Sequence, residues 1–316
     1  MTANGTMRAA LYDRYGGPEE LYVGRVPKPS PGPGEVLVKV TALSVNGGEL
    51  AARAGRVKLL TGRRFPQRVG LDFSGEVEAT GSPMTRLRPG DRVWGVLPRT
   101  AGFGSAAEYV VVRPRQLAHL PEGMDPVEAA ALPVGTTAIT ALRDKARLRP
   151  GERLLVRGAS GGVGNVAVQL GRAYGARVTG LAGAGNLGLV RELGAHEAYD
   201  YRTTSPDDLG PFDVILDTVG NQLVHYSRLL TRGGRMTTVA FDMDHRVRSL
   251  TTILTTRHLR FFSGDPRHDL FADLSAYAAA GALRPVVDSV FPLEEIAEAH
   301  RALESGGVRG KHLVRV

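Results

Sequence analysis

The sequence contains no cysteine, and this absence removes several kinds of chemistry at once. Disulfide bonds, thiolate nucleophiles, iron–sulfur clusters and cysteine-ligated zinc all need a residue that the chain lacks. The eight histidines show no pairing at the close spacing that is typical of metal ligands. We therefore expect no bound metal, and no zinc in particular.

Long hydrophobic runs are also missing. No stretch approaches the roughly 20 apolar residues that cross a bilayer. The first residues, MTANGTMRAALYDRYG, lack the apolar core of a signal peptide. These features predict a cytoplasmic protein without a membrane partner.

Lysine is scarce, and the net charge of +8 therefore comes almost entirely from arginine. The arginines are spread along the chain, and no RNA-binding signature accompanies them. We expect a basic globular surface and no nucleic-acid partner. Such a surface favours anionic ligands, for example the phosphates of a dinucleotide.

The length of 316 residues predicts two domains, since a domain typically takes about 150 residues. The first part of the chain has the pattern of short β-strands separated by Gly/Pro-rich turns, which is typical of a barrel or sandwich. Its valine-rich runs are residues 35–40, 75–79, 92–96 and 108–112. A helical pattern begins near residue 125.

From residue 153 onward, continuously apolar strands alternate with helical segments in two successive β-α-β-α-β patterns. Apolar strands of this kind are typical of a parallel sheet that helices cover on both faces. The pattern predicts an α/β fold with a doubly wound parallel sheet of six strands, which is the Rossmann arrangement.

The clearest motif is RLLVRGASGGVG at residues 153–164, which follows a predicted strand and opens a helix. Glycines at 158, 161, 162 and 164 permit a sharp turn, a close approach of a pyrophosphate and tight helix packing. The helix N-terminus then favours the phosphate charge. The motif predicts a dinucleotide site, although its spacing is G-x-x-G-x-x-G and not G-x-G-x-x-G.

The same residues allow two other interpretations. Gly158 to Gly162 match G-x-S-x-G, the nucleophile turn of serine hydrolases, with Ser160 as nucleophile. Asp217 with His225 or His245 would complete a triad. That turn should follow several α/β strands, whereas the upstream sequence is of β type. A glycine-rich turn without a ligand is the second alternative.

The choice of cofactor depends on the end of the second strand of the parallel sheet. NAD sites usually carry an acid there that binds the ribose hydroxyls. Residues 181–186, LAGAGN, contain none, and the first acid is Glu192 within the next helix. A 2′-phosphate would meet no repulsion, so NADPH is favoured over NADH. Arg202 or Arg177 would supply the positive charge.

Taken together, these segments resemble the medium-chain dehydrogenase/reductase superfamily, and most closely its zinc-independent quinone oxidoreductases and alkenal/enone reductases. The matching motifs include PGPGEVLVKVTALSVN, VGLDFSGEVEATG, LRPGDRVWGV, AAALPVGTTAITAL, FDVILDTVG and GKHLVRV, in the family's order. The resemblance implies a GroES-like catalytic domain at 1–122, completed by 266–316, and a Rossmann domain at 123–265. It also implies a ligand cleft at their junction and a homodimer, for which the exposed sheet edge near 235–241 is a candidate contact.

The resemblance also assigns individual residues. Asn46, Thr137 and Glu49 fall at the catalytic positions. The cofactor contacts would be Gly158, Ser160, Gly161, Gly162, Val163, Gly164, Asn186, Tyr201, Gly220, Ala240, Phe241, Phe262 and Lys311. Asp72 resembles a marker of the domain fold.

Several positions depart from the family pattern. Gly70-Leu71-Asp72 stands where zinc-dependent relatives carry Gly-His-Glu, and their four-cysteine lobe is missing. In VNGGELA at 45–51, glycine replaces a proline, Glu49 replaces an aspartate and Ala51 replaces a lysine. Val57 stands where enoyl-thioester reductases carry a tyrosine. These differences indicate a remodelled substrate pocket.

The expected activity is NADPH-dependent reduction of quinones or α,β-unsaturated carbonyls by hydride transfer, without zinc. One alternative is a biosynthetic enzyme of the same fold whose remodelled pocket catalyses a non-redox or specialised enoyl/keto reaction. Another is an NADPH-binding regulatory protein that binds RNA.

Overall fold

The computed structural model describes residues 5–82, 86–98, 102–240, 251–253, 256, 258–262 and 266–316. The chain forms two compact units. The β unit comprises Met1–Pro133, Asp265–Ala279 and Pro285–Val316, and the Rossmann unit comprises Val134–Gly264 and Ala280–Arg284. Each unit has its own sheets and core.

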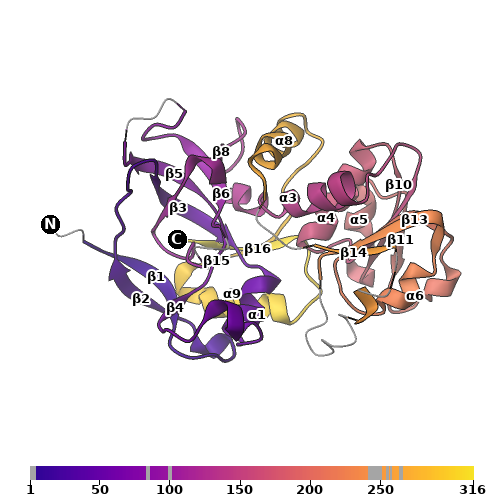
Figure 1. The fold of residues 1–316 in the computed structure, drawn as a ribbon, viewed down its shortest axis with the longest axis horizontal. Helices are drawn as coiled ribbons and strands as arrows, with labels where there is room; N and C mark the ends of the chain where they lie inside the picture. The colour runs from indigo at the N-terminus through magenta and orange to yellow at the C-terminus, as the bar shows by residue number, and fades with distance from the viewer. Residues whose placement is uncertain are drawn as a thin grey trace. The chain divides into compact units, whose positions relative to one another are not determined.

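The β unit contains two sheets. In the smaller one, β1 (Thr6–Tyr12) lies between β2 (Tyr22–Pro27) and β4 (Gln67–Arg68). The order of the larger one is β15 (Val287–Pro292), β16 (Lys311–Arg315), β3 (Val36–Ser44), β5 (Asp72–Thr80), β6 (Arg92–Val96) and β8 (Leu117–His119), and β7 (Tyr109–Val112) also pairs with β3. The C-terminal β16 runs antiparallel to β3, so yellow and purple strands are neighbours in Figure 1.

Valine-rich segments form the core of the larger sheet. The four runs that the sequence predicts as strands lie in β3, β5, β6 and β7. Their inward side chains form one cluster that includes Val36, Val38, Phe73, Val77 and Val93, each at most 1% exposed. The helices of this unit are α1 (Gly47–Arg53), α2 (Lys58–Thr61), α8 (His268–Ala279) and α9 (Ile296–Glu304).

The segment after residue 122 packs with the β unit, whereas the sequence placed it in the Rossmann domain. A short 3-10 helix at Glu128–Ala131 buries Ala130 and Ala131 against Ala42 and Leu313 of the larger sheet. The helical pattern then continues as α3 (Gly135–Ile139) and a π-helical turn at Thr140–Lys145.

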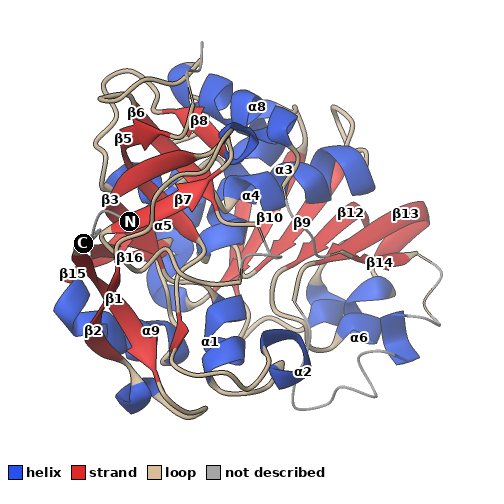
Figure 2. Ribbon diagram, turned by 60° about the vertical axis from the view of Figure 1, so that its left-hand side comes forward, coloured by secondary structure: helices blue, strands red, loops and turns tan. Residues whose placement is uncertain are grey.

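The Rossmann unit is a parallel sheet of six strands, as predicted. Its order is β11 (Glu197–Asp200), β10 (Arg177–Ala182), β9 (Arg153–Arg157), β12 (Phe212–Asp217), β13 (Leu230–Thr238) and β14 (Leu259–Phe261). The helices α3 and α4 (Gly162–Ala173) lie on one side of the sheet and α6 (Leu223–Ser227) on the other (Figure 2). Helix α5 (Leu187–Glu192) follows β10.

The strand order corrects one expectation about the sheet edge. Strand β13 lies between β12 and β14, so the segment near 235–241 is not an open edge. Strand β14 forms this edge of the sheet instead, because its Leu259 pairs with Met236 of β13. Phe241 lies outside the described residues.

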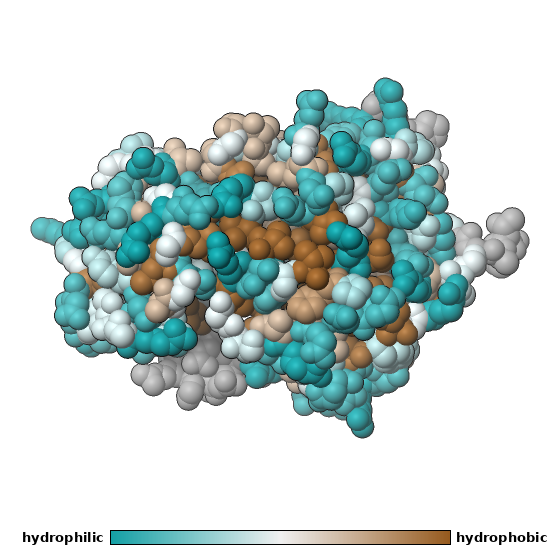
Figure 3. All heavy atoms as spheres, turned by 180° about the vertical axis from the view of Figure 1, so that it is seen from behind, coloured by the Kyte–Doolittle hydropathy of each residue, from teal (hydrophilic) through white to brown (hydrophobic). Residues whose placement is uncertain are grey.

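On the face shown in Figure 3, hydrophobic side chains gather in the middle, and polar ones surround them. The large exposed ones include Tyr22 in β2, Leu59 in α2, Tyr201 after β11, Val224 in α6 and Phe261 in β14. Among the residues that the structure describes, none of the helices combines the length and apolar character of a membrane span.

Candidate active site

The carboxyl edge of the parallel sheet gathers most of the predicted cofactor residues. Parallel strands all end at the same edge, which is where open α/β sheets bind ligands. One residue follows the end of each strand there: Gly158 after β9, Asn186 after β10, Tyr201 after β11, Gly220 after β12, Ala240 after β13 and Phe262 after β14.

The turn between β9 and α4 needs glycine at two positions for clear reasons. Gly158 has φ of +71°, and a Cβ there would lie 2.4 Å from Thr218 Oγ1. A Cβ on Gly164 would lie 2.0 Å from the carbonyl oxygen of Gly158. At Gly161, in contrast, a Cβ would meet only ordinary contact at 3.4 Å, so this part of the turn is open for a phosphate.

Two predicted cofactor residues are joined directly. Asn186 Nδ2 donates to Ser160 Oγ at 3.2 Å, which ties the turn after β10 to the turn after β9. Ser160 is buried and Val163 half-buried. The backbone cradle and the start of α4 fit a dinucleotide pyrophosphate.

The partners considered for Ser160 in a serine hydrolase triad bind other residues instead. Asp217 binds Arg157, Thr238 and the Gly220 backbone, and His225 lies 3.0 Å from Asp207. His245 lies outside the described residues. The arrangement of Asp217 and His225 gives Ser160 no base.

A buried ion pair organises the same edge, and sequence reasoning missed it. Arg157 Nη1 lies 2.5 Å from Asp217 Oδ1, and its guanidinium stacks 3.6 Å from the Tyr226 ring centre. Arg157 also binds the carbonyl and side chain of Asn221, while burial raises the pKa of Asp217. A signal was present in the sequence, because Arg157 and Asp217 each directly follow three apolar strand residues.

Only one of the two arginines considered for a 2′-phosphate lies at this edge. Arg202 stacks 4.6 Å from the ring of the exposed Tyr201, and its Nη1 would lie 2.9 Å from a Cβ on Gly183. Arg177 begins β10 at the opposite edge, where it pairs with Glu197. The expectation for Arg177 is therefore wrong.

Thr137 lies in α3 of the Rossmann unit and is half-buried. No other described residue accepts or donates a hydrogen bond at its hydroxyl. The group is thus open to a ligand.

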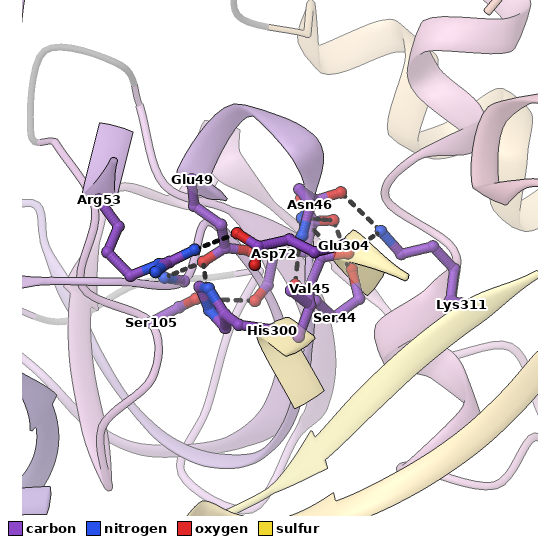
Figure 4. A network of polar contacts seen from close by, with 11 residues as sticks. Ser44, Val45, Asn46, Glu49, Arg53, Asp72, Ser105, His300, Glu304 and Lys311 are labelled. Carbon is purple, nitrogen blue, oxygen red and sulfur yellow. Dashed lines mark hydrogen bonds and ion pairs between the residues drawn. The ribbon is translucent and has the colours of Figure 1, made fainter. Parts of the chain in front are cut away.

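The other predicted catalytic residues meet in a polar network of the β unit (Figure 4). Asn46 Nδ2 donates to Asp72 Oδ2 at 2.9 Å and to the Ser44 carbonyl at 3.1 Å. Lys311 Nζ donates to Asn46 Oδ1 at 2.6 Å and to the Val45 carbonyl at 2.7 Å. Three segments distant in sequence therefore fix the orientation of the Asn46 amide.

Glu49 is completely buried at the start of α1. Its carboxylate accepts from the backbone N–H of Asn46 at 2.6 Å and of Gly70 at 2.5 Å. The first contact is the reach-back that a glutamate at this helix position often makes. Burial raises the pKa of Glu49 to about 7.

Burial also shifts the pKa values of the neighbouring groups. It raises the pKa of Asp72 and lowers the pKa of Lys311, while the opposite charges of the two groups oppose both changes. The ammonium and the carboxylates thus share one desolvated region.

Sequence reasoning missed three members of this region. Asp72, taken as a fold marker, holds Asn46. Arg53 binds the Gly16 carbonyl and Glu304. His300 lies 4.0 Å from Glu49, and burial lowers its pKa to about 3. A hint for His300 was its place on the face of α9 that buries Ile296 and Ala299.

The donor set around Asp72 does not fit zinc. Asp72 Oδ2 already accepts from Ser44 and Asn46, the adjacent residue is Leu71, and the Lys311 ammonium favours a carboxylate without a second cation. Within the described residues, no cluster of three histidine, aspartate or glutamate side chains is arranged to hold a metal ion.

Comparisons with known proteins agree with this architecture. Residues 32–122 match the alcohol dehydrogenase GroES-like domain, and residues 193–314 match the zinc-binding dehydrogenase family. Pig (Sus scrofa) quinone oxidoreductase is 33% identical, covering 99% of both chains. Human mitochondrial NAD(P)H oxidoreductase RTN4IP1 is 32% identical over 90% of this chain and 82% of its own.

Solved structures give the same picture. The quinone oxidoreductase from Coxiella burnetii superposes with a TM-score of 0.90 at 28% identity, covering 99% of this chain and all of that one. The fold and the sequence relatives together define an oxidoreductase. The chain belongs to the medium-chain dehydrogenase/reductase superfamily, among its quinone oxidoreductase-like members, a family that typically binds NAD(P).

Proposed function

We propose that this protein is an NADPH-dependent reductase of quinones or α,β-unsaturated carbonyls that works without zinc. The quinone oxidoreductases among its relatives support the acceptor class. The absence of cysteine and the occupied donor set of Asp72 support a zinc-free reaction. We also propose a cytoplasmic homodimer, although the RTN4IP1 relatives are named as mitochondrial.

The observation that carries the proposal is the composition of the carboxyl edge. The glycine turn supplies a cradle for a pyrophosphate, and Arg202 lies beside Gly183 at the end of β10. An adenosine 2′-phosphate bound there would meet a guanidinium, which forms strong paired hydrogen bonds with phosphate. The 181–186 segment provides no carboxylate for the ribose hydroxyls of NADH.

A bound nicotinamide dinucleotide supplies the hydride. The protein must then stabilise the negative charge that develops on the oxygen of the acceptor, which hydrogen-bond donors aimed at that oxygen achieve. The open hydroxyl of Thr137 is one candidate donor. The Asn46 amide is the other, and it would exchange its longer bond, to the Ser44 carbonyl at 3.1 Å, for the acceptor oxygen.

Lys311 and Glu49 act in this scheme as positioning residues. Lys311 withdraws electron density from Asn46 through Oδ1, which makes the Nδ2 hydrogens better donors. Glu49 holds the backbone of Asn46 and Gly70 together, and its burial keeps it from delivering a proton to a ligand. Water supplies the proton that completes reduction of the acceptor in this scheme.

The test is oxidation of NADPH and NADH by the purified protein with a panel of quinones, enones and enals. We expect turnover with at least one acceptor and a preference for NADPH. Arg202→Ser should raise the KM for NADPH roughly tenfold, because it removes a charged hydrogen bond to phosphate, and leave that for NADH nearly unchanged. Arg177→Ser is the matched control at the other edge. Tight NADPH binding without any oxidation would contradict the proposal.

A further inference from the structure

A cavity lies at the edge of the Rossmann sheet where the strands begin. Its volume is about 520 Å³, and it is lined at the starts of β9, β12, β13 and β14. Strand β9 has five residues, so this edge is roughly 16 Å from the glycine turn at about 3.3 Å per residue. The cavity is therefore separate from the proposed dinucleotide site.

The lining of this cavity is strongly basic. Its cationic side chains are Lys145, Arg147, Arg149, Arg232, Arg235 and Arg260. All except Arg235 are exposed, and none of those five has a side-chain partner among the described residues. A set of like charges around one hollow is costly unless an anion occupies it, since each charge raises the potential felt by the others.

The two acids in the lining do not neutralise these cations. Glu152 binds Arg235 through both carboxylate oxygens, at 2.8 and 2.7 Å. Asp213 accepts from Thr231 and from the backbone of Arg153, which lowers its pKa. The five exposed cations therefore remain available to a ligand.

The floor of the cavity is fixed in place. Arg235 also donates to the carbonyl oxygens of Ala146 at 2.5 Å and Arg147 at 2.8 Å. It thereby holds the turn in which Arg147 adopts φ of +50°, a conformation that non-glycine residues rarely take. Lys145, Arg147 and Arg149 in and next to this turn line the cavity together with Arg232.

We propose that this cavity binds a small molecule that carries two or more phosphate groups. Arginine binds phosphate through paired, charge-assisted hydrogen bonds, and several arginines around one hollow match several phosphates. The volume lies in the range of small-ligand sites, and too few apolar side chains line it to hold an apolar molecule. This inference is independent of the proposed reductase activity.

The probe is inorganic tripolyphosphate, titrated calorimetrically into the full-length protein at about 150 mM salt, where long-range charge effects are screened. The test variant is Arg232→Ser with Arg260→Ser. The control variant is Arg86→Ser with Arg88→Ser, an equal loss of charge from two exposed arginines of the β unit. Each titration is repeated with saturating NADPH, which occupies the glycine turn.

We expect saturable binding that persists with NADPH, and a Kd raised roughly tenfold or more in the test variant but less than about twofold in the control. Displacement by NADPH would place the probe at the glycine turn and overturn the proposal. Equal weakening in both variants would indicate non-specific charge attraction and would overturn the proposal as well. Binding of a short RNA oligonucleotide that needs Arg232 and Arg260, with no binding of tripolyphosphate, would also overturn it.

Discussion

At the residue scale, Asn46 connects the polar network to the proposed chemistry. Its amide is held by Lys311 on one side and by Asp72 on the other, which presents it in one orientation. Because the amide is already oriented, it needs only to release its bond to the Ser44 carbonyl in order to donate to the developing charge. The orientation of the Asn46 amide therefore depends on Lys311 and Asp72 as well.

Replacing Asn46 by alanine tests this role. We expect kcat to fall by roughly 10- to 100-fold, as is typical when one donor to a developing charge is removed. The Kd for NADPH should stay within about twofold, because the glycine turn is unchanged. The measurements are steady-state kinetics and NADPH fluorescence titration. An unchanged kcat would remove Asn46 from the mechanism.

Glu49 gives a prediction about stability and pH. Burial raises its pKa in the folded state to about 7, above the unfolded value of about 4.3. Between these values the folded protein holds a proton that the unfolded chain has lost, so the contribution of Glu49 to stability falls as the pH rises. A glutamine at position 49 does not ionise, so the Glu49→Gln variant should not lose stability in this way as the pH rises.

The free energy of unfolding of Glu49→Gln, relative to wild type, should therefore increase by about 2 kcal/mol from about pH 5 to about pH 8. Urea unfolding across this range measures the difference. Asp72 and His300 face the same region in both proteins, whereas the pKa of Lys311 also responds to the charge of Glu49. Parallel pH profiles of the two proteins would contradict a raised pKa at Glu49.

At the element scale, the packing of α4 against the start of its own turn sets the shape of the cofactor cradle. Gly164→Ala places a methyl group 2.0 Å from the Gly158 carbonyl oxygen. The helix must then shift, and overpacking of this kind costs about 2 kcal/mol or more. Gly161→Ala is the matched control, since its methyl group meets only ordinary contact.

Thermal unfolding of the two variants measures this difference. We expect a clear loss of stability in Gly164→Ala and little change in Gly161→Ala, which should instead weaken NADPH binding by crowding the phosphate. Equal unfolding temperatures for both variants would show that close helix packing at Gly164 is not required.

Elements whose signal is local were predicted well from the sequence. The apolar strands and the glycine turn produce the six-stranded parallel sheet and its carboxyl edge. The helical pattern that begins near residue 125 did not predict the division of this segment into a 3-10 helix, α3 and a π-helical turn, because that division depends on tertiary packing such as that of Ala130 and Ala131. The order of β13 and β14 depends on pairing that no local pattern encodes.

The candidate site was predicted only in part, for a related reason. Residues of the glycine turn are neighbours in sequence, so their common role is visible there. The contacts of Asn46 with Asp72 and Lys311 join β5 and β16 to the start of α1, and a single sequence carries no record of such pairings. Arg53 and His300 were missed because buried ionisable residues are rare and no sequence motif predicts them.

At the scale of the whole molecule, the protein has one proposed catalytic site and one proposed site for a phosphorylated small molecule. The net charge of +8 favours both, because the dinucleotide and a phosphorylated small molecule are anions. The acid-free end of β10 and the basic hollow at the opposite edge lie in the same unit. The central claim concerns the first site, namely that the protein transfers hydride from NADPH to a carbon or oxygen acceptor.

The most direct measurement follows the hydride itself. NADPH deuterated at the transferred C4 position is incubated with the protein and an enone, and the product is analysed by mass spectrometry. We expect deuterium at the β-carbon of the reduced product, with one NADPH oxidised for each molecule formed. A reduced product without deuterium, or no oxidation of bound NADPH by any acceptor of the panel, would contradict the proposed hydride transfer.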